Sequence, residues 1–148
     1  MSADPNRLFT LAEANAMLPL VRAITADLAK MSAEVFERHR QLHRVMAGRE
    51  EEESNLYSEE LFQVQQDLDK EADRLEEYLA ELKELGVEPR NGPQGMIDTV
   101  DFPSNRDGQV VYLCWQLGED EISHWHELEA GFAGRQQLFA EVSGEEEI

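Results

Sequence analysis

The residue types that carry site chemistry gather in one stretch of the sequence, from Tyr112 to Gln136. This stretch holds both tryptophans, the only cysteine and two of the four histidines of the chain. Its last part, Gly131 to Gln136, places two glycines beside Arg135. Metal binding, anion binding and nucleophilic chemistry are therefore the three kinds of site to weigh here, and each has a purely structural alternative.

A metal site is the first interpretation. His124 and His126 lie two residues apart in a predicted strand, so both imidazoles would face the same side. Glu129 follows closely enough to add a carboxylate oxygen. Two histidines and a carboxylate form a ligand set for zinc, iron or manganese, so a divalent metal is the one cofactor to consider. In the alternative, His126 is a partly buried histidine bonded to a backbone or carboxylate group and His124 is exposed.

An anion or other ligand is the second interpretation. Gly131 to Arg135 can present backbone N–H groups and a guanidinium to an anion, with His126 and Glu129 beside them. The G-x-x-G spacing by itself is not a phosphate-loop signature. In a chain this acidic, Arg135 is also expected to serve as an internal salt-bridge hub among neighbouring glutamates. His126, Glu129 and Arg135 therefore form either a site or a polar clasp that holds the sheet to the helices.

Nucleophilic chemistry has less support. Cys114 can act as a nucleophile if a histidine serves as its base, but in a strand of valine, tyrosine, leucine and tryptophan a cysteine is more often a small core residue. Core packing is the expected role of Trp115 and Trp125. His39 and His43 lack the Glu-x-x-His motif of metal sites in helical bundles. We therefore assign no catalytic residue.

Composition narrows the class of protein. A length of 148 residues suits a single domain over 1–148, and the net charge of −19 disfavours binding to nucleic acid or to anionic membrane surfaces. The chain has no run of 18 apolar residues and no visible signal peptide. A single cysteine is compatible with a reducing compartment. These features predict a cytoplasmic protein.

A long helical hairpin is predicted over residues 10–86. Thr10 and Glu13 form a capping box, and apolar residues then recur at three- and four-residue steps as far as Gly48. Pro19 interrupts this pattern, which predicts either a short helix of about residues 11–17 followed by a new one, or a kink. The second helix is predicted from an N-cap at Ser58 to Gly86 as the residue after its end.

Residues 95–136 are predicted to form a small antiparallel sheet of two or three strands and a glycine-rich turn. The expected strands are 96–102, 109–117 and 121–126, with a loop at 103–108. The segment E-P-R-N-G-P-Q-G before them is predicted to be a linker, and residues 143–148 an acidic tail. The fold class is therefore α+β, with the hairpin packed on the sheet.

In a single hairpin, the two helices pack on each other along only one stripe each. The apolar residues outside these stripes therefore need further cover. Either the C-terminal part of the chain folds back on the hairpin, or a second copy of the chain covers it. The preferred arrangement is a two-fold helical homodimer resembling a coiled coil. The leading hypothesis is therefore a non-enzymatic scaffold that acts through its helical surface on an unidentified protein partner. The alternative is a metal- or anion-binding protein, with hydrolysis as its activity, whose site surrounds His126, Glu129 and Arg135.

Four motifs together resemble a known family. They are F-T-L-A-E-A-N-A-M-L-P at 9–19, D-F-P at 101–103, L-C-W-Q-L-G-E at 113–119 and W-H-E-L-E-A-G-F-A-G-R-Q at 125–136. The chain resembles the uncharacterised bacterial family called domain of unknown function 2203. This resemblance implies a small bacterial protein with a helical front and a strand-containing end, and it implies no established activity. A histidine at position 124 is not part of the family pattern, which weighs against a metal site that needs both histidines.

Overall fold

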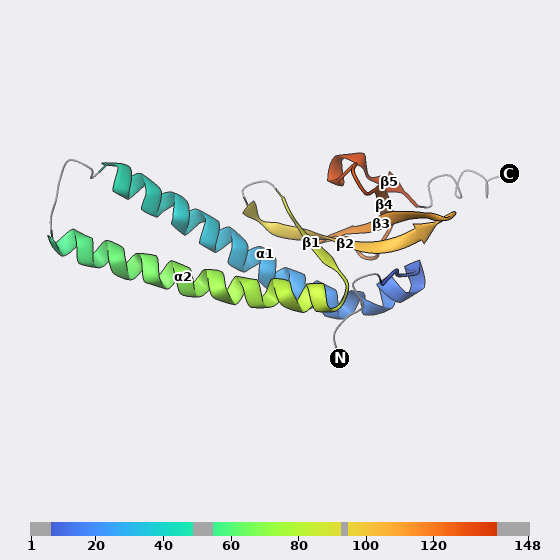
Figure 1. The fold of residues 1–148 in the computed structure, drawn as a ribbon, viewed down its shortest axis with the longest axis horizontal. Helices are drawn as coiled ribbons and strands as arrows, with labels where there is room; N and C mark the ends of the chain where they lie inside the picture. The colour runs from blue at the N-terminus through green and yellow to red at the C-terminus, as the bar shows by residue number, and fades with distance from the viewer. Residues whose placement is uncertain (1–6, 49–54, 93–94, 139–148) are drawn as a thin grey trace.

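The protein is an α+β structure in which a helical hairpin covers one face of an antiparallel sheet. The computed structural model describes residues 7–48, 55–92 and 95–138. The hairpin consists of α1 (Leu11–Gly48) and α2 (Asn55–Glu84). The sheet lies against the half of the hairpin that contains the start of α1 and the end of α2, and the other half projects beyond the sheet (Figure 1). The predicted fold class is confirmed.

The start of α1 follows the predicted capping box. The Thr10 backbone N–H donates to Glu13 Oε1 at 2.9 Å, and the Glu13 backbone N–H donates to Thr10 Oγ1 at 3.1 Å. Pro19 lies inside a continuous helix, so the interpretation of two separate helices is wrong. The helix continues because residues on both sides of Pro19, such as Leu18 and Val21, are buried in the same core.

The end of α2 is also the predicted one. Gly86 adopts a φ of 89°, a left-handed conformation that glycine accepts without strain. The Val87 backbone N–H donates to the Leu82 carbonyl at 3.0 Å, which closes the last turn. The helix begins at Asn55 rather than after Ser58, so the predicted start is wrong by about one helical turn.

The sheet has five strands, so the prediction of two or three strands is wrong. One added strand forms from the predicted linker, where Pro89 is tolerated because this edge strand pairs on one side only. The other added strand is only two residues long, too short to show a periodic pattern. All neighbours are antiparallel and follow chain order: β1 (Glu88–Asn91), β2 (Ile97–Arg106), β3 (Gln109–Gln116), β4 (His124–Glu127) and β5 (Gln136–Gln137).

Strand β2 continues through Pro103, where a loop was predicted. Pairing of β1 with β2 stops at Asp101, so the nitrogen of Pro103 faces an edge where no ladder hydrogen bond is needed. The carbonyl of Pro103 instead accepts the Phe9 backbone N–H at 2.7 Å. The turn itself is only Asp107–Gly108, and both residues have positive φ, as a tight hairpin requires.

The two faces of the sheet differ in chemistry because side chains alternate along each strand. Val100 and Phe102 of β2 face the helices together with Trp115 of β3, and all three belong to the buried core. Asp101 and the residue paired with it, Cys114, lie on the opposite face. This second face, which the hairpin does not cover, is where buried polar groups collect.

Two further sequence predictions concern the rest of the chain. Within the described residues, neither helix contains a segment that is both long and apolar enough to cross a membrane. The predicted acidic tail at 143–148 lies outside the described residues.

Candidate functional site

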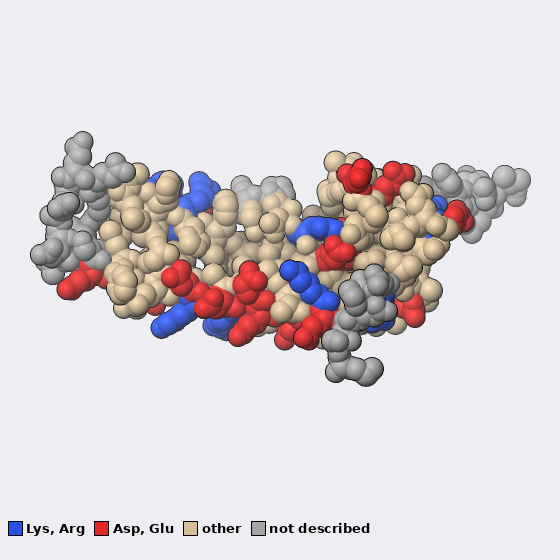
Figure 2. Space-filling view, viewed as in Figure 1, with Lys and Arg blue, Asp and Glu red and all other residues tan. Residues whose placement is uncertain are grey.

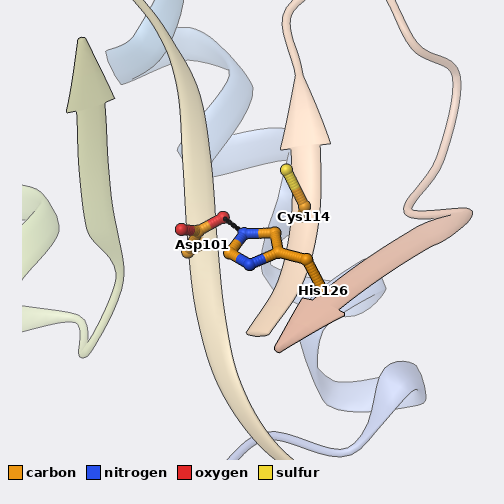
Figure 3. A group of neighbouring side chains, drawn as sticks. All are labelled: Asp101, Cys114 and His126. Atoms are coloured by element: carbon orange, nitrogen blue, oxygen red, sulfur yellow. Dashed lines mark hydrogen bonds and ion pairs between the residues drawn. The ribbon is translucent and has the colours of Figure 1, made fainter. Parts of the chain in front are cut away.

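A pocket of about 480 Å³ opens on the face of the sheet that the hairpin does not cover. Three of its buried lining residues, Asp101, Cys114 and His126, come from β2, β3 and β4 respectively (Figure 3). The remaining lining residues are Arg90, Asn91, Gly92, Asp98, Thr99, Gln116, Leu128, Glu129, Gly131 and Phe132. The pocket is therefore formed by the sheet together with the segment that follows β4.

His126 reaches across the sheet to Asp101. Its Nε2 lies 3.0 Å from Asp101 Oδ1, although β3 separates their two strands in the sheet. Figure 3 shows the two side chains pointing toward each other, with Cys114 on the intervening strand. His126 is only 2% exposed, so this contact lies away from solvent. Cys114 lies beside the contact because it pairs with Asp101 across the ladder and shares its face.

The protonation of His126 is constrained by its other ring nitrogen. Nδ1 lies 2.8 Å from the Glu127 carbonyl oxygen. A carbonyl oxygen can only accept, so Nδ1 must carry the hydrogen and donate it. In a neutral imidazole, Nε2 would then present a lone pair to a carboxylate oxygen. The short Nε2–Oδ1 contact therefore requires a cation between the two atoms, either a proton or a metal ion.

Arg90 supports Asp101 from the other side. Its Nε donates to Asp101 Oδ2 at 2.8 Å, and one terminal nitrogen donates to Glu88 Oε1 at 3.0 Å. Each oxygen of Asp101 thus has its own partner, which is how a buried carboxylate avoids a large desolvation cost. Arg90 is already engaged by two carboxylates and is not a free anion receptor.

Cys114 is a protonated thiol in this environment. Burial, followed by the nearby charge of Asp101, raises the pKa of Cys114 from its ordinary 9.0 to about 12. The thiolate is the nucleophilic form of cysteine, so this thiol is not poised to attack at neutral pH. The complete burial of Cys114 agrees with the sequence interpretation of a small core residue.

We predict that Cys114 resists alkylation in folded, chelator-treated protein. At pH 8 its thiolate fraction should be about a thousandfold lower than in unfolded chains, and access is restricted as well. Iodoacetamide labelling followed by mass spectrometry, with and without urea, measures the two rates. Because the pKa of the Cys114 thiol is higher in the folded than in the unfolded chain, the protonated thiol stabilises the fold. This contribution to the free energy of unfolding is complete below pH 9 and declines as the pH rises toward 12. Equal labelling rates in folded and unfolded protein would contradict this prediction.

The structure separates the residues that the sequence grouped as metal ligands. Among the described residues, the group whose ligand atoms lie within 4.8 Å of one another is Asp101, Cys114 and His126. His124 is not in this group: its Nδ1 lies 3.5 Å from Glu119 Oε2. Glu129 lines the pocket but is exposed. His126 is therefore the one residue that belongs both to the predicted set and to the buried cluster.

Arg135 has the geometry of a clasp. One terminal nitrogen lies 2.7 and 2.8 Å from the two carboxylate oxygens of Glu119, and 3.4 Å from the Cys114 carbonyl oxygen. The side chain is only 11% exposed and does not line the pocket. Glu119 also accepts the backbone N–H of Gln116 at 2.8 Å. Arg135 thus ties the segment after β4 to the turn after β3, so its contacts do not hold the sheet to the helices as the predicted clasp would. Its carboxylate partner among the described residues is Glu119 rather than Glu127 or Glu129.

Sequence reasoning did not find Asp101, Arg90 or Glu119. For Asp101 a local signal existed: it stands between Val100 and Phe102, so in a strand it must face away from the side on which they pack. Its neighbours on that second face could not be inferred, because they depend on how β2, β3 and β4 align. Arg90 was assigned to the linker, so its place in a strand beside Asp101 was not expected.

The fold and this pocket define a class: an α+β protein with a hairpin on one sheet face and a buried polar cluster on the other. The sequence profile of the family described as an uncharacterized conserved protein (DUF2203) matches residues 7–138. The chain therefore belongs to this family, as its motifs had suggested, and the match includes both the hairpin and the pocket. No curated protein and no solved structure matches the chain significantly.

Proposed function

We propose that the protein is a scaffold that self-associates into a homodimer through the projecting half of its hairpin. The observation that supports this most directly is a group of large apolar side chains that the monomer leaves exposed there. Phe62 is 64% exposed, and three more are exposed on the same half of the hairpin: Val45, Met46 and Val64. Between the helices, Leu42, Leu61 and Leu68 line an open groove of about 440 Å³. Exposed apolar surface of this kind marks an interaction site.

The charges of this half of the hairpin favour a second copy as the occupant. Residues 36–47 of α1 contain three arginines and one glutamate, whereas residues 59–71 of α2 contain five acidic residues and one lysine. Acidic side chains run along α2 in Figure 2. Within one chain, Arg38 already pairs with Glu71 across the two helices. A two-fold arrangement with α1 of each copy against α2 of the other repeats this pairing between chains.

This arrangement is a four-helix bundle with the packing of a short coiled coil, and it leaves the two sheets outside the bundle. The sheets and their pockets would then be displayed on a common helical support, which is what a scaffold requires. We place this scaffold in the cytoplasm. The net charge of −19 argues against nucleic acid as its partner.

Sedimentation velocity over a range of protein concentrations tests the homodimer. We expect a reversible dimer, and we expect Phe62→Glu to weaken it by at least about thirtyfold, since central aromatic residues of interfaces commonly contribute 2 kcal/mol or more. Leu20→Glu is the matched control, because Leu20 is also exposed but lies on the half of α1 that the sheet covers. A wild-type monomer at all concentrations would overturn the proposal, as would equal weakening by the two variants.

A second function is favoured by the composition of the pocket. Its lining holds three carboxylates, from Asp98, Asp101 and Glu129, and one guanidinium, from Arg90, which is already paired. This excess of negative charge favours a cation over an anion. We therefore propose that the pocket binds a metal cation. A metal with an open coordination position activates bound water, so hydrolysis is the reaction class that such a site supports.

Elemental analysis of tag-free protein purified without chelators tests the second function. We expect about one divalent metal ion per chain, since one cation suffices for the single Asp101–His126 contact. A magnesium or calcium content equal to that of a blank buffer, together with no transition metal, would contradict it.

A further inference from the structure

We infer that the pocket cation is a transition metal of the zinc type, held by Asp101, Cys114 and His126. This inference rests on the proposal that the pocket binds a cation, and it adds the ligands and the class of metal. One carboxylate oxygen, one sulfur and one imidazole nitrogen lie within 4.8 Å of one another, and all three residues are buried. They come from three adjacent strands, so a metal there would bridge the middle of the sheet.

The chemistry of the donors selects the metal. A cysteine sulfur is a soft ligand that favours zinc and related transition metals, whereas magnesium and calcium require oxygen ligands. Three protein ligands drawn from histidine, cysteine and a carboxylate match the ligand number of zinc sites that keep one position for an exchangeable ligand. Because Asp101, Cys114 and His126 all line the pocket, the fourth coordination position would face the pocket.

The surrounding groups orient the three ligands as a metal site requires. The Nδ1–H of His126 donates to the Glu127 carbonyl, which fixes the tautomer that leaves the Nε2 lone pair directed at Asp101. Metal-binding histidines commonly donate their second ring N–H to a carbonyl or carboxylate in this way. Arg90 holds the oxygen of Asp101 that does not face His126. The ligands are therefore already positioned before any metal binds.

A metal ion would take the place of the proton at the centre of the cluster. Without a metal, a proton must lie between His126 Nε2 and Asp101 Oδ1, and Cys114 keeps its thiol proton. Binding of M²⁺ would release both protons to solvent and leave a neutral imidazole, a carboxylate and a thiolate around the ion. Charge is conserved in this exchange: one doubly charged cation replaces two protons, and no redox partner is needed.

Titration of the chelator-treated, tag-free full-length protein with Co²⁺ tests this ligand set. Cobalt occupies zinc sites, and a cysteine thiolate bound to it gives an intense charge-transfer absorption in the near ultraviolet. We expect this band to saturate at one Co²⁺ per chain and to disappear when Zn²⁺ is added in equal amount. Addition of azide should shift the visible cobalt bands, since the fourth position faces the pocket.

Variants identify the ligands. Cys114→Ser should abolish the charge-transfer band, and Asp101→Asn and His126→Gln should each weaken Co²⁺ binding by more than the 10- to 100-fold typical of changes next to a metal ligand. His124→Gln is the matched control, since His124 pairs with Cys114 across the ladder but its side chain lies outside the cluster, and it should change affinity by less than about threefold. Glu129→Gln removes an exposed carboxylate of the pocket and tests whether that carboxylate supplies a ligand. Circular dichroism confirms that each variant is folded.

Two outcomes overturn the inference, and they can be told apart. Metal that binds without the charge-transfer band, and is lost in His124→Gln or Glu129→Gln, would mean that the pocket takes a cation through other ligands. The proposed cation pocket would then stand and this ligand set would fail. If neither Co²⁺ nor Zn²⁺ binds the folded wild-type protein, both proposals fail, and His126 and Asp101 form a buried pair that shares a proton.

Discussion

His126→Ala should lower the free energy of unfolding of chelator-treated protein by about 3–5 kcal/mol, the range for breaking a buried ion pair by removing one partner. The variant leaves Asp101 Oδ1 buried without the ring nitrogen that now lies 3.0 Å away. Arg90 continues to donate through its Nε to the other oxygen, Oδ2. Urea denaturation followed by circular dichroism measures the loss, and the chelator prevents bound metal from contributing to it.

His124→Ala is the control for this variant. His124 is on the same strand and faces the same side of the sheet, but its contact with Glu119 is longer, at 3.5 Å, and is partly exposed. We expect it to lose less than about 1 kcal/mol. Equal losses from the two substitutions would show that the stability of β4 depends on histidine packing in general rather than on the contact with Asp101.

Phe102→Ala should lower the free energy of unfolding by about 3–5 kcal/mol, the range for removing a buried phenylalanine. Phe102 is fully buried on the sheet face that meets the hairpin. Its ring meets the ring of Phe9 edge to face, with 5.2 Å between centroids. The substitution therefore opens a cavity at the junction of the sheet and the segment that leads into α1. Urea denaturation provides the measurement.

Phe132→Ala is the control for the core variant, because the same side chain is removed from an exposed position. The guanidinium carbon of Arg135 lies 4.6 Å from the centroid of the Phe132 ring. A cation–π contact of this kind contributes about 1 kcal/mol or less at an exposed site. A loss in Phe102→Ala that is no larger than the loss in Phe132→Ala would contradict the position assigned to the core.

The helices were predictable because their signals are local. The Thr10–Glu13 capping box lies within four residues, and the two hydrogen bonds it implies are present. Gly86 marks the end of α2 because glycine adopts the left-handed conformation required there. Pro19 shows the limit of local reasoning: its clash with the preceding turn favours a break, but burial of the apolar stripe on both sides keeps one helix.

The sheet was predicted in part. The apolar, β-branched run in β3 is a strong local signal, and β3 is present. Strand β1 has no such signal, because its four residues are polar apart from Pro89; pairing with β2 alone makes it a strand. The sequence also shows no reason for β2 to continue through Pro103. Strand β2 can continue through Pro103 because β1 no longer pairs with it there, and this depends on how the sheet is assembled.

The candidate site divides in the same way. The sequence by itself determined the class of fold, the helical hairpin with its exposed apolar surface, the acidic charge and the stretch in which His126 lies. Only the tertiary structure decided that His126 meets Asp101 and Cys114, and that Arg135 pairs with Glu119. The physical reason is that strand register sets these contacts: Asp101 and Cys114 share a face because they are ladder partners. The spacing of Asp101 and Cys114 in the sequence does not indicate that they pair.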